Sequence, residues 1–172
     1  MSKFHLAFAT PRMVKEVVQE LVLPLFHSIP DKSRDDGHII IVGPLMIKAE
    51  GKPFPAKYSL EPTIIYEYSI GNKSNWEFPF DEIAQCKALQ MYHERNIPGN
   101  MNSQAHMLFE NDTPFWGAHR EGLLIAGFSG IQPYYDQMLS KIALAAIVAR
   151  SEHAKQIWLA KHNGECFVQS DE

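Results

Sequence analysis

The chain contains 172 residues, of which 45% are apolar and 21% are charged, and its formal net charge is −4. That length suits one ordinary hydrophobic core and is short for two, so we expect a single domain over residues 1–172. Because the net charge is negative, the protein has no basic field that would attract nucleic-acid phosphates or anionic lipids. Because no apolar stretch has the length of a signal-peptide core or a membrane span, we expect a cytoplasmic protein with neither a nucleic-acid nor a membrane partner.

The first predicted helix begins at Thr10-Pro11. The Thr10 hydroxyl can cap free helical amides, and proline suits the first helical position, where no backbone donor is required. Apolar residues then recur with helical spacing at Met13, Val14, Val17, Val18, Leu21, Val22 and Leu25. We expect this helix to end or bend around Pro24.

Two stretches rich in β-branched residues predict strands. Residues 38–42 (HIIIV) have the composition of a short strand that is buried on both faces. Residues 63–70 (TIIYEYSI) predict a second strand, which the turn residues Gly71-Asn72 close. The stretch 51–55 breaks the pattern between them.

From about residue 80 to 95 the apolar residues recur with the spacing of a helix. Two acidic residues stand at its N-terminal end, where the helix dipole favours negative charge. Residues 96–104 contain a proline, a glycine and three asparagines, which is typical of a loop. Residues 115–118 and 123–128 predict two adjacent antiparallel strands that flank a turn at 119–122.

Beyond Pro133 the chain has no proline or glycine until Asn163-Gly164, which predicts one long helix or two in tandem, with Ser151 as a candidate internal cap and Gly164 as the stop. The order is therefore helix, strands, helix, strands, helix. That order favours an α+β sandwich, in which helices flank a mainly antiparallel sheet.

The stretch GFSGIQPYYD (residues 127–136) invites comparison with the serine nucleophile elbow, G-x-S-x-G. The comparison fails because Ile131 stands where the second glycine belongs. A turn alone explains Ser129-Gly130, while a functional interpretation adds that the free amides of the following helix start can bind an anion or carboxylate. On the functional interpretation the candidate ligand-binding residues are Lys87, Ser129, Gly130 and Asp136.

Histidine residues are candidate ligands for iron or haem, because neutral imidazole coordinates both. The candidates are His93, His106 and His119, with His153 as a fourth, and no spacing among them raises one above the others. The zinc-protease pattern H-E-x-x-H is absent at His93 because residue 97 is isoleucine. The Met and aromatic residues between 91 and 116 suit a core, a subunit interface or an apolar pocket.

Residues 80–89 (FDEIAQCKAL), together with the region from Thr113-Pro114 to Asp136, resemble the GlcG/HbpS family, also called haem-degrading-like, which includes the C-terminal domain of PduO-type proteins. The matching positions are Lys87-Ala88, Pro114, Gly127, Ser129, Gly130 and Asp136, and the resemblance covers residues 60–150. Where the family has a glycine pair before the proline, this chain has Asp112-Thr113, which removes a place of close backbone approach. The segment 42–62 is a second departure, an unusual insert relative to the family.

The resemblance implies a profilin-like sandwich that assembles into homo-oligomers and binds a small-molecule ligand, with haem or a related tetrapyrrole as the first candidate. An enzyme acting on a small organic acid, with Lys87, Ser129 and Asp136 meeting near a helix start, is one alternative. The other is a non-catalytic scaffold, in which the Ala-rich last helix packs against its copy in another subunit.

Overall fold

The computed structural model describes residues 2–4, 6–30, 34–48, 55–58, 61–95, 105–163, 165 and 168. Within these residues the chain is an α+β protein, as the order of predicted elements indicates. None of the described helices combines the length and the apolar character needed to cross a bilayer. The principal elements are β1 (Ser2–Phe4), α1 (Pro11–Val17), η1 (Val18–Val22), α2 (Leu23–Ser28), β2 (Gly37–Gly43), β3 (Met46–Lys48), β4 (Pro55–Tyr58), β5 (Thr63–Ile70), α3 (Phe80–Tyr92), β6 (Ala118–Glu121), β7 (Leu124–Ser129) and α4 (Pro133–Lys161).

A four-stranded antiparallel sheet in the order β5-β2-β7-β6 forms the centre of the fold. Strand β2 lies inside the sheet and every one of its seven residues is buried. This confirms the predicted strand that is buried on both faces. Strand β5 has the predicted bounds. The sheet therefore has two interior strands, β2 and β7, whose two faces must both be covered.

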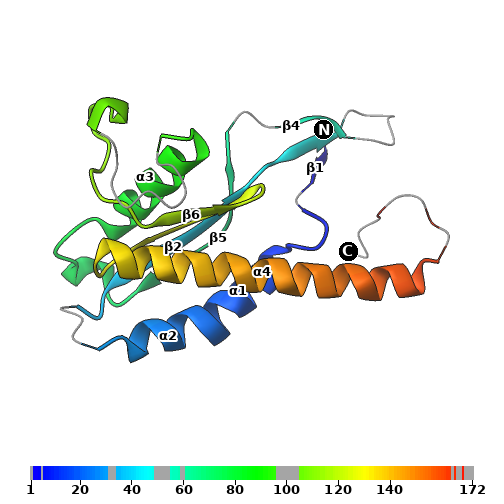
Figure 1. Cartoon of the computed structure of the whole chain (residues 1–172), viewed down its shortest axis with the longest axis horizontal. Coiled ribbons are helices and arrows are strands. Elements are labelled where there is room, and N and C mark those ends of the chain that lie inside the picture. The colour runs from blue at the N-terminus through cyan, green and yellow to red at the C-terminus, as the bar shows by residue number, and fades with distance from the viewer. Residues whose placement is uncertain are drawn as a thin grey trace.

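Helices cover the two faces of this sheet, and Figure 1 shows α3 on one side with α1, α2 and the long α4 on the other. The α4 side holds the larger core, to which α1, η1, β2, β7 and α4 contribute. The α3 side holds a smaller core made by Ile40, Val42, Ala84, Ala88, Met91, Ala118 and Ile125. Residues of β2 thus alternate between the two cores, as the period of a strand requires.

A second, three-stranded antiparallel sheet in the order β1-β3-β4 lies outside the predicted pattern. Strands β3 and β4 fall inside the segment 42–62, which the sequence shows only as an insert. Their partner β1 comes from the extreme N-terminus, and no local pattern links the two regions. This sheet was therefore invisible to reasoning from local composition.

The N-terminal helix begins as predicted, because the Thr10 hydroxyl accepts a hydrogen bond from the Met13 amide at 3.3 Å. Around Pro24, where we expected the helix to end or bend, the regular α-helix is interrupted but the helical chain does not end. The helical chain continues to Ser28, and it widens to π-helical hydrogen bonding over η1, directly before the proline. A proline has no amide to donate, so regular α-helical hydrogen bonding cannot continue unchanged through Pro24.

The β6–β7 hairpin is shifted from its expected place. The strand expected at 115–118 lies at Ala118–Glu121, and the turn is Gly122-Leu123 instead of 119–122. Gly122 has φ 57°, the left-handed conformation that a two-residue hairpin loop needs, so it fixes the register. His119 consequently lies within a strand.

The last helix is one continuous helix of 29 residues, and α3 ends at Tyr92, close to its predicted end. Ser151 does not cap a second helix: its hydroxyl donates to the carbonyls of Ile147 and Phe8. The predicted loop at 96–104 and the predicted stop at Gly164 lie outside the described residues.

Strand β7 approaches α3 closely at Gly127. A Cβ atom at this position would lie 2.5 Å from the backbone oxygen of Ala84 and 3.2 Å from the Cβ of Ala88. We predict that Gly127→Ala lowers the free energy of unfolding by about 1–3 kcal/mol, because the helix must move away from the sheet. Urea denaturation measures this change.

The matched control is Gln85→Ala, on the exposed face of the same helix, α3. It should change stability by less than about 0.5 kcal/mol. Equal effects of the two substitutions would contradict close packing at Gly127.

Candidate functional site

The predicted ligand-binding residues converge on a buried ion pair. The Lys87 ammonium lies 2.8 Å from the Asp136 carboxylate and donates a second hydrogen bond, of 3.0 Å, to the carbonyl of Phe128. Their side chains are 1% and 4% exposed, respectively. The pair joins α3, the end of β7 and the first turn of α4.

The local sequence explains why these groups meet. Strand β7 ends at Ser129, the chain turns through Gly130, and α4 begins at Pro133, so that Asp136 lies in its first turn. The second carboxylate oxygen of Asp136 accepts a hydrogen bond from the Ile131 amide at 3.1 Å. Gly130 is needed because a Cβ atom there would lie 2.6 Å from the carbonyl oxygen of Asp36.

Burial is the largest influence on the Asp136 carboxyl and raises its pKa. The Lys87 ammonium and the backbone amides of Gly130 and Ile131 act in the opposite direction, because they stabilise the carboxylate. A partner of opposite charge and a full set of hydrogen bonds are what a buried charge requires. The pair is therefore satisfied entirely by groups of the protein.

The structure thus brings Lys87, Gly130 and Asp136 together, with Ser129 buried beside them at the end of β7. The free amides at this helix start already have an anion, which is the carboxylate of Asp136 itself. The contacts described here give the four residues a structural role. A ligand or a catalytic reaction at this point stays a prediction.

The candidate metal ligands do not meet one another. His93, His106 and His153 are exposed on three separate elements. His119 is half-buried on β6; its Nδ1 atom has no hydrogen-bond partner, and its Nε2 atom lies 3.8 Å from a Glu121 carboxylate oxygen. Among the described residues no group of three or more His, Cys, Asp or Glu side chains could hold a metal ion.

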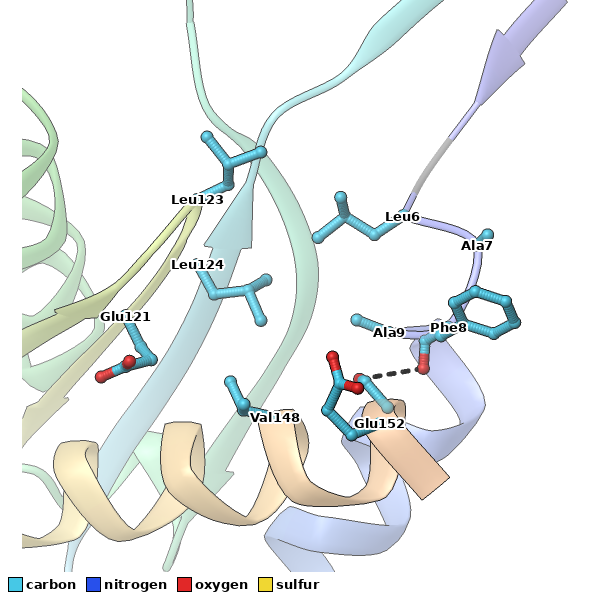
Figure 2. A pocket seen from close by; sticks show the side chains of 10 residues that line it. Leu6, Ala7, Phe8, Ala9, Glu121, Leu123, Leu124, Val148 and Glu152 are labelled. Atoms are coloured by element: carbon cyan, nitrogen blue, oxygen red, sulfur yellow. Dashed lines mark hydrogen bonds between the residues drawn. The ribbon is translucent and has the colours of Figure 1, made fainter. Parts of the chain in front are cut away.

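An apolar cavity of about 300 Å³ lies at the far end of the domain from the ion pair. As Figure 2 shows, its wall combines the segment before α1, the tip of the β6–β7 hairpin and the middle of α4. The lining residues are Leu6, Ala7, Phe8, Ala9, Glu121, Leu123, Leu124, Val148, Ser151 and Glu152. None of the sequence-predicted site residues is among them.

The cavity depends on contacts between three segments that are distant in sequence. Ser151 fixes the N-terminal segment to α4 through a 3.0 Å hydrogen bond to the Phe8 carbonyl (Figure 2). Leu123 at the hairpin tip is 54% exposed, although it is a large apolar residue. No local pattern marks these residues, so only the fold could reveal the cavity.

A second arrangement that sequence reasoning missed lies across β2 and β5. His38 Nδ1 is 3.0 Å from the Ser69 hydroxyl, and its Nε2 is 3.4 Å from a Glu67 carboxylate oxygen, without hydrogen-bond geometry. Burial lowers the pKa of His38, and the Lys73 ammonium acts in the same direction, while the carboxylates of Glu67 and Asp81 oppose both. The signal in the sequence was a histidine in an otherwise apolar strand.

Comparison with known proteins adds no further assignment. No protein-family model, no curated protein and no solved structure matches this chain. What the chain does has to follow from its own residues and their geometry.

The lowered pKa of His38 predicts a pH dependence of stability. A histidine whose pKa is lower in the folded than in the unfolded state contributes stability above about pH 6.5, and that contribution is lost as the pH falls towards the lowered value. His119, whose pKa is lowered by burial and by Lys141, acts in the same direction. We expect the free energy of unfolding to decrease from pH 7.5 to pH 5.5 less steeply in His38→Asn than in the unaltered chain.

Urea denaturation of both proteins at the two pH values measures this difference. Asparagine at position 38 keeps an acceptor for Ser69 and removes the titrating ring. Parallel pH dependences would show that His38 titrates normally in the folded protein.

Proposed function

We propose that this protein binds a small apolar molecule in the cavity between α4, the β6–β7 hairpin and the segment before α1. The cavity itself carries the proposal. It is concave and lined mainly by aliphatic and aromatic side chains, as ligand pockets generally are. Its volume lies at the lower end of the range for such pockets, so the ligand is small.

The charged groups at the cavity define the ligand further. Glu121 and Glu152 are its charged lining residues, and both are acidic. Lys155 pairs with Glu152 at 2.5 Å on the exposed side of α4, but it is not part of the lining. An anionic ligand would therefore meet repulsion, and we propose an uncharged or cationic molecule.

Haem does not fit these residues. The proteins that hold haem ligate its iron through His, Cys, Met or Tyr, and none of these residue types is among the lining residues that the structure describes. The two glutamates would also face the haem propionates with like charge. Haem binding, expected from the resemblance to the GlcG/HbpS family, is for this reason not part of the proposal for the cavity.

Assembly into homo-oligomers stays a prediction alongside ligand binding. The resemblance to the GlcG/HbpS family supports it. The exposed Ile157 and Leu159 near the C-terminal end of α4 are consistent with it.

The proposal is tested with two fluorescent probes that share one aromatic framework. N-phenyl-1-naphthylamine is uncharged, and 1-anilinonaphthalene-8-sulfonate carries a negative charge. We expect saturable binding of the uncharged probe and at least about tenfold weaker binding of the sulfonate, which corresponds to about 1.4 kcal/mol. Changing both Glu121 and Glu152 to glutamine should narrow that difference.

Val148→Trp fills the cavity from α4 and should abolish binding of the uncharged probe. The matched control is Ala149→Trp, which adds the same ring one position further along α4, at an exposed residue outside the lining. Absence of binding to the unaltered protein, or equal binding by both tryptophan variants, would contradict the proposal.

A further inference from the structure

Ser69, His38 and Glu67 form a continuous polar array on the face of the sheet that α3 covers. The β2–β5 register places His38 directly opposite Ser69, and Glu67 lies two residues before Ser69, on the same face of β5. The distances are 3.0 Å from His38 Nδ1 to Ser69 Oγ and 3.4 Å from His38 Nε2 to Glu67 Oε2. The array is on the opposite face of the sheet from the cavity, so it is independent of the proposed function.

The three side chains of the array differ in their exposure to solvent. The His38 ring is 2% exposed and lies in line with Ile40 and Val42, which pack against α3. Trp76 lies edge-on to this ring, with the ring centroids 6.3 Å apart. Ser69 is half-buried and the Glu67 side chain is 54% exposed. Solvent therefore reaches the Glu67 end of the array, whereas Ser69 is half-buried and the imidazole is sheltered.

The hydrogen-bonding capacity of neutral imidazole fixes the direction of the array. When Nδ1 accepts the hydrogen bond of the Ser69 hydroxyl, Nε2 carries the ring proton and faces the Glu67 carboxylate. A hydroxyl next to a neutral imidazole, which is itself oriented by a carboxylate, is the arrangement that activates a serine nucleophile. Strands β2 and β5 hold all three groups on a regular sheet.

We propose that Ser69 is a nucleophile that accepts acyl groups from small carboxylic esters, with His38 as its general base and Glu67 as the carboxylate whose negative charge stabilises the protonated His38 ring. Ser69 Oγ bonds to the ester carbonyl carbon while its proton passes to His38 Nδ1. The carbon–oxygen bond to the alcohol then breaks, and the departing oxygen takes that proton. Water next attacks the acyl-serine, gives one proton to His38, and releases the carboxylic acid as Ser69 recovers the proton.

The surroundings favour a short acyl group. Trp76 flanks the imidazole, and its indole N–H donates to the Ile70 carbonyl at 3.1 Å, which fixes it against β5 next to Ser69. The Lys73 ammonium lies 5.4 Å from the centre of the Trp76 ring on the solvent side and is paired with the Asp81 carboxylate at 2.7 Å. Acetyl esters are therefore the substrates to examine first.

The first experiment labels the unaltered protein with a fluorophosphonate, from which an activated serine displaces fluoride, and locates the adduct by peptide mass spectrometry. We expect one adduct on Ser69 that disappears in His38→Gln. No adduct, or an adduct on a different serine, overturns the proposal. Because the unaltered protein is labelled, this result does not depend on the folding of a variant.

The second experiment measures hydrolysis of p-nitrophenyl acetate. Ser69→Ala and His38→Gln should each lower kcat/KM at least about 100-fold. Glu67→Gln should move the acid limb of the kcat/KM profile to lower pH, because the Glu67 carboxylate raises the pKa of His38. Ser28→Ala, an exposed serine on α2, is the matched control and should leave the rate unchanged. Equal rates for Ser69→Ala and Ser28→Ala overturn the proposal.

Discussion

The ion pair between Lys87 and Asp136 is the interaction on which the arrangement of the domain depends. It is buried, and its hydrogen bonds reach the end of β7 and the turn before α4, so it fixes three elements at one point. Gly117 must lack a side chain here, because a Cβ atom would lie 2.6 Å from the Cβ of Asp136. Ser140 then holds the carbonyl of Gly117 at 2.7 Å. Removing one partner would leave an unpaired buried charge, which strongly destabilises the fold, so substitution of either residue should be poorly tolerated.

The pair also fixes the first turn of α4, the helix whose middle lines the cavity. From Asp136 to Val148 a helix rises about 18 Å, so the direction that the first turn of α4 takes decides which part of the helix faces the hairpin tip. The ion pair lies at the start of α4, whereas the apolar cavity lies against the middle of α4 and the tip of the β6–β7 hairpin. The polar array around His38 lies on the face that α3 covers. The ion pair, the apolar cavity and the polar array thus lie at separate places around the four-stranded sheet.

Local patterns in the sequence predicted the elements that local physics controls. The Thr10 cap, the β-branched strands β2 and β5, and the unbroken run of α4 were readable because capping, branching and helical spacing act within a few residues. The β1-β3-β4 sheet and the cavity were not, because their residues meet only through tertiary pairing. Lys87 and Asp136 were found as a pair of candidates, but their burial, which defines their role, required the packing of α3 against β7.

The most direct test of the role of the buried ion pair is a double-mutant cycle on Lys87→Met and Asp136→Asn. Urea denaturation measures the free energy of unfolding of each variant. Each single change should lower the free energy of unfolding by about 3–5 kcal/mol, and the double variant should lose clearly less than the sum of the two. Lys73→Met with Asp81→Asn, an exposed pair at 2.7 Å, is the control cycle and should change stability little. Additive losses, or a Lys87→Met protein as stable as the Lys73→Met control, would contradict the central role of the buried pair.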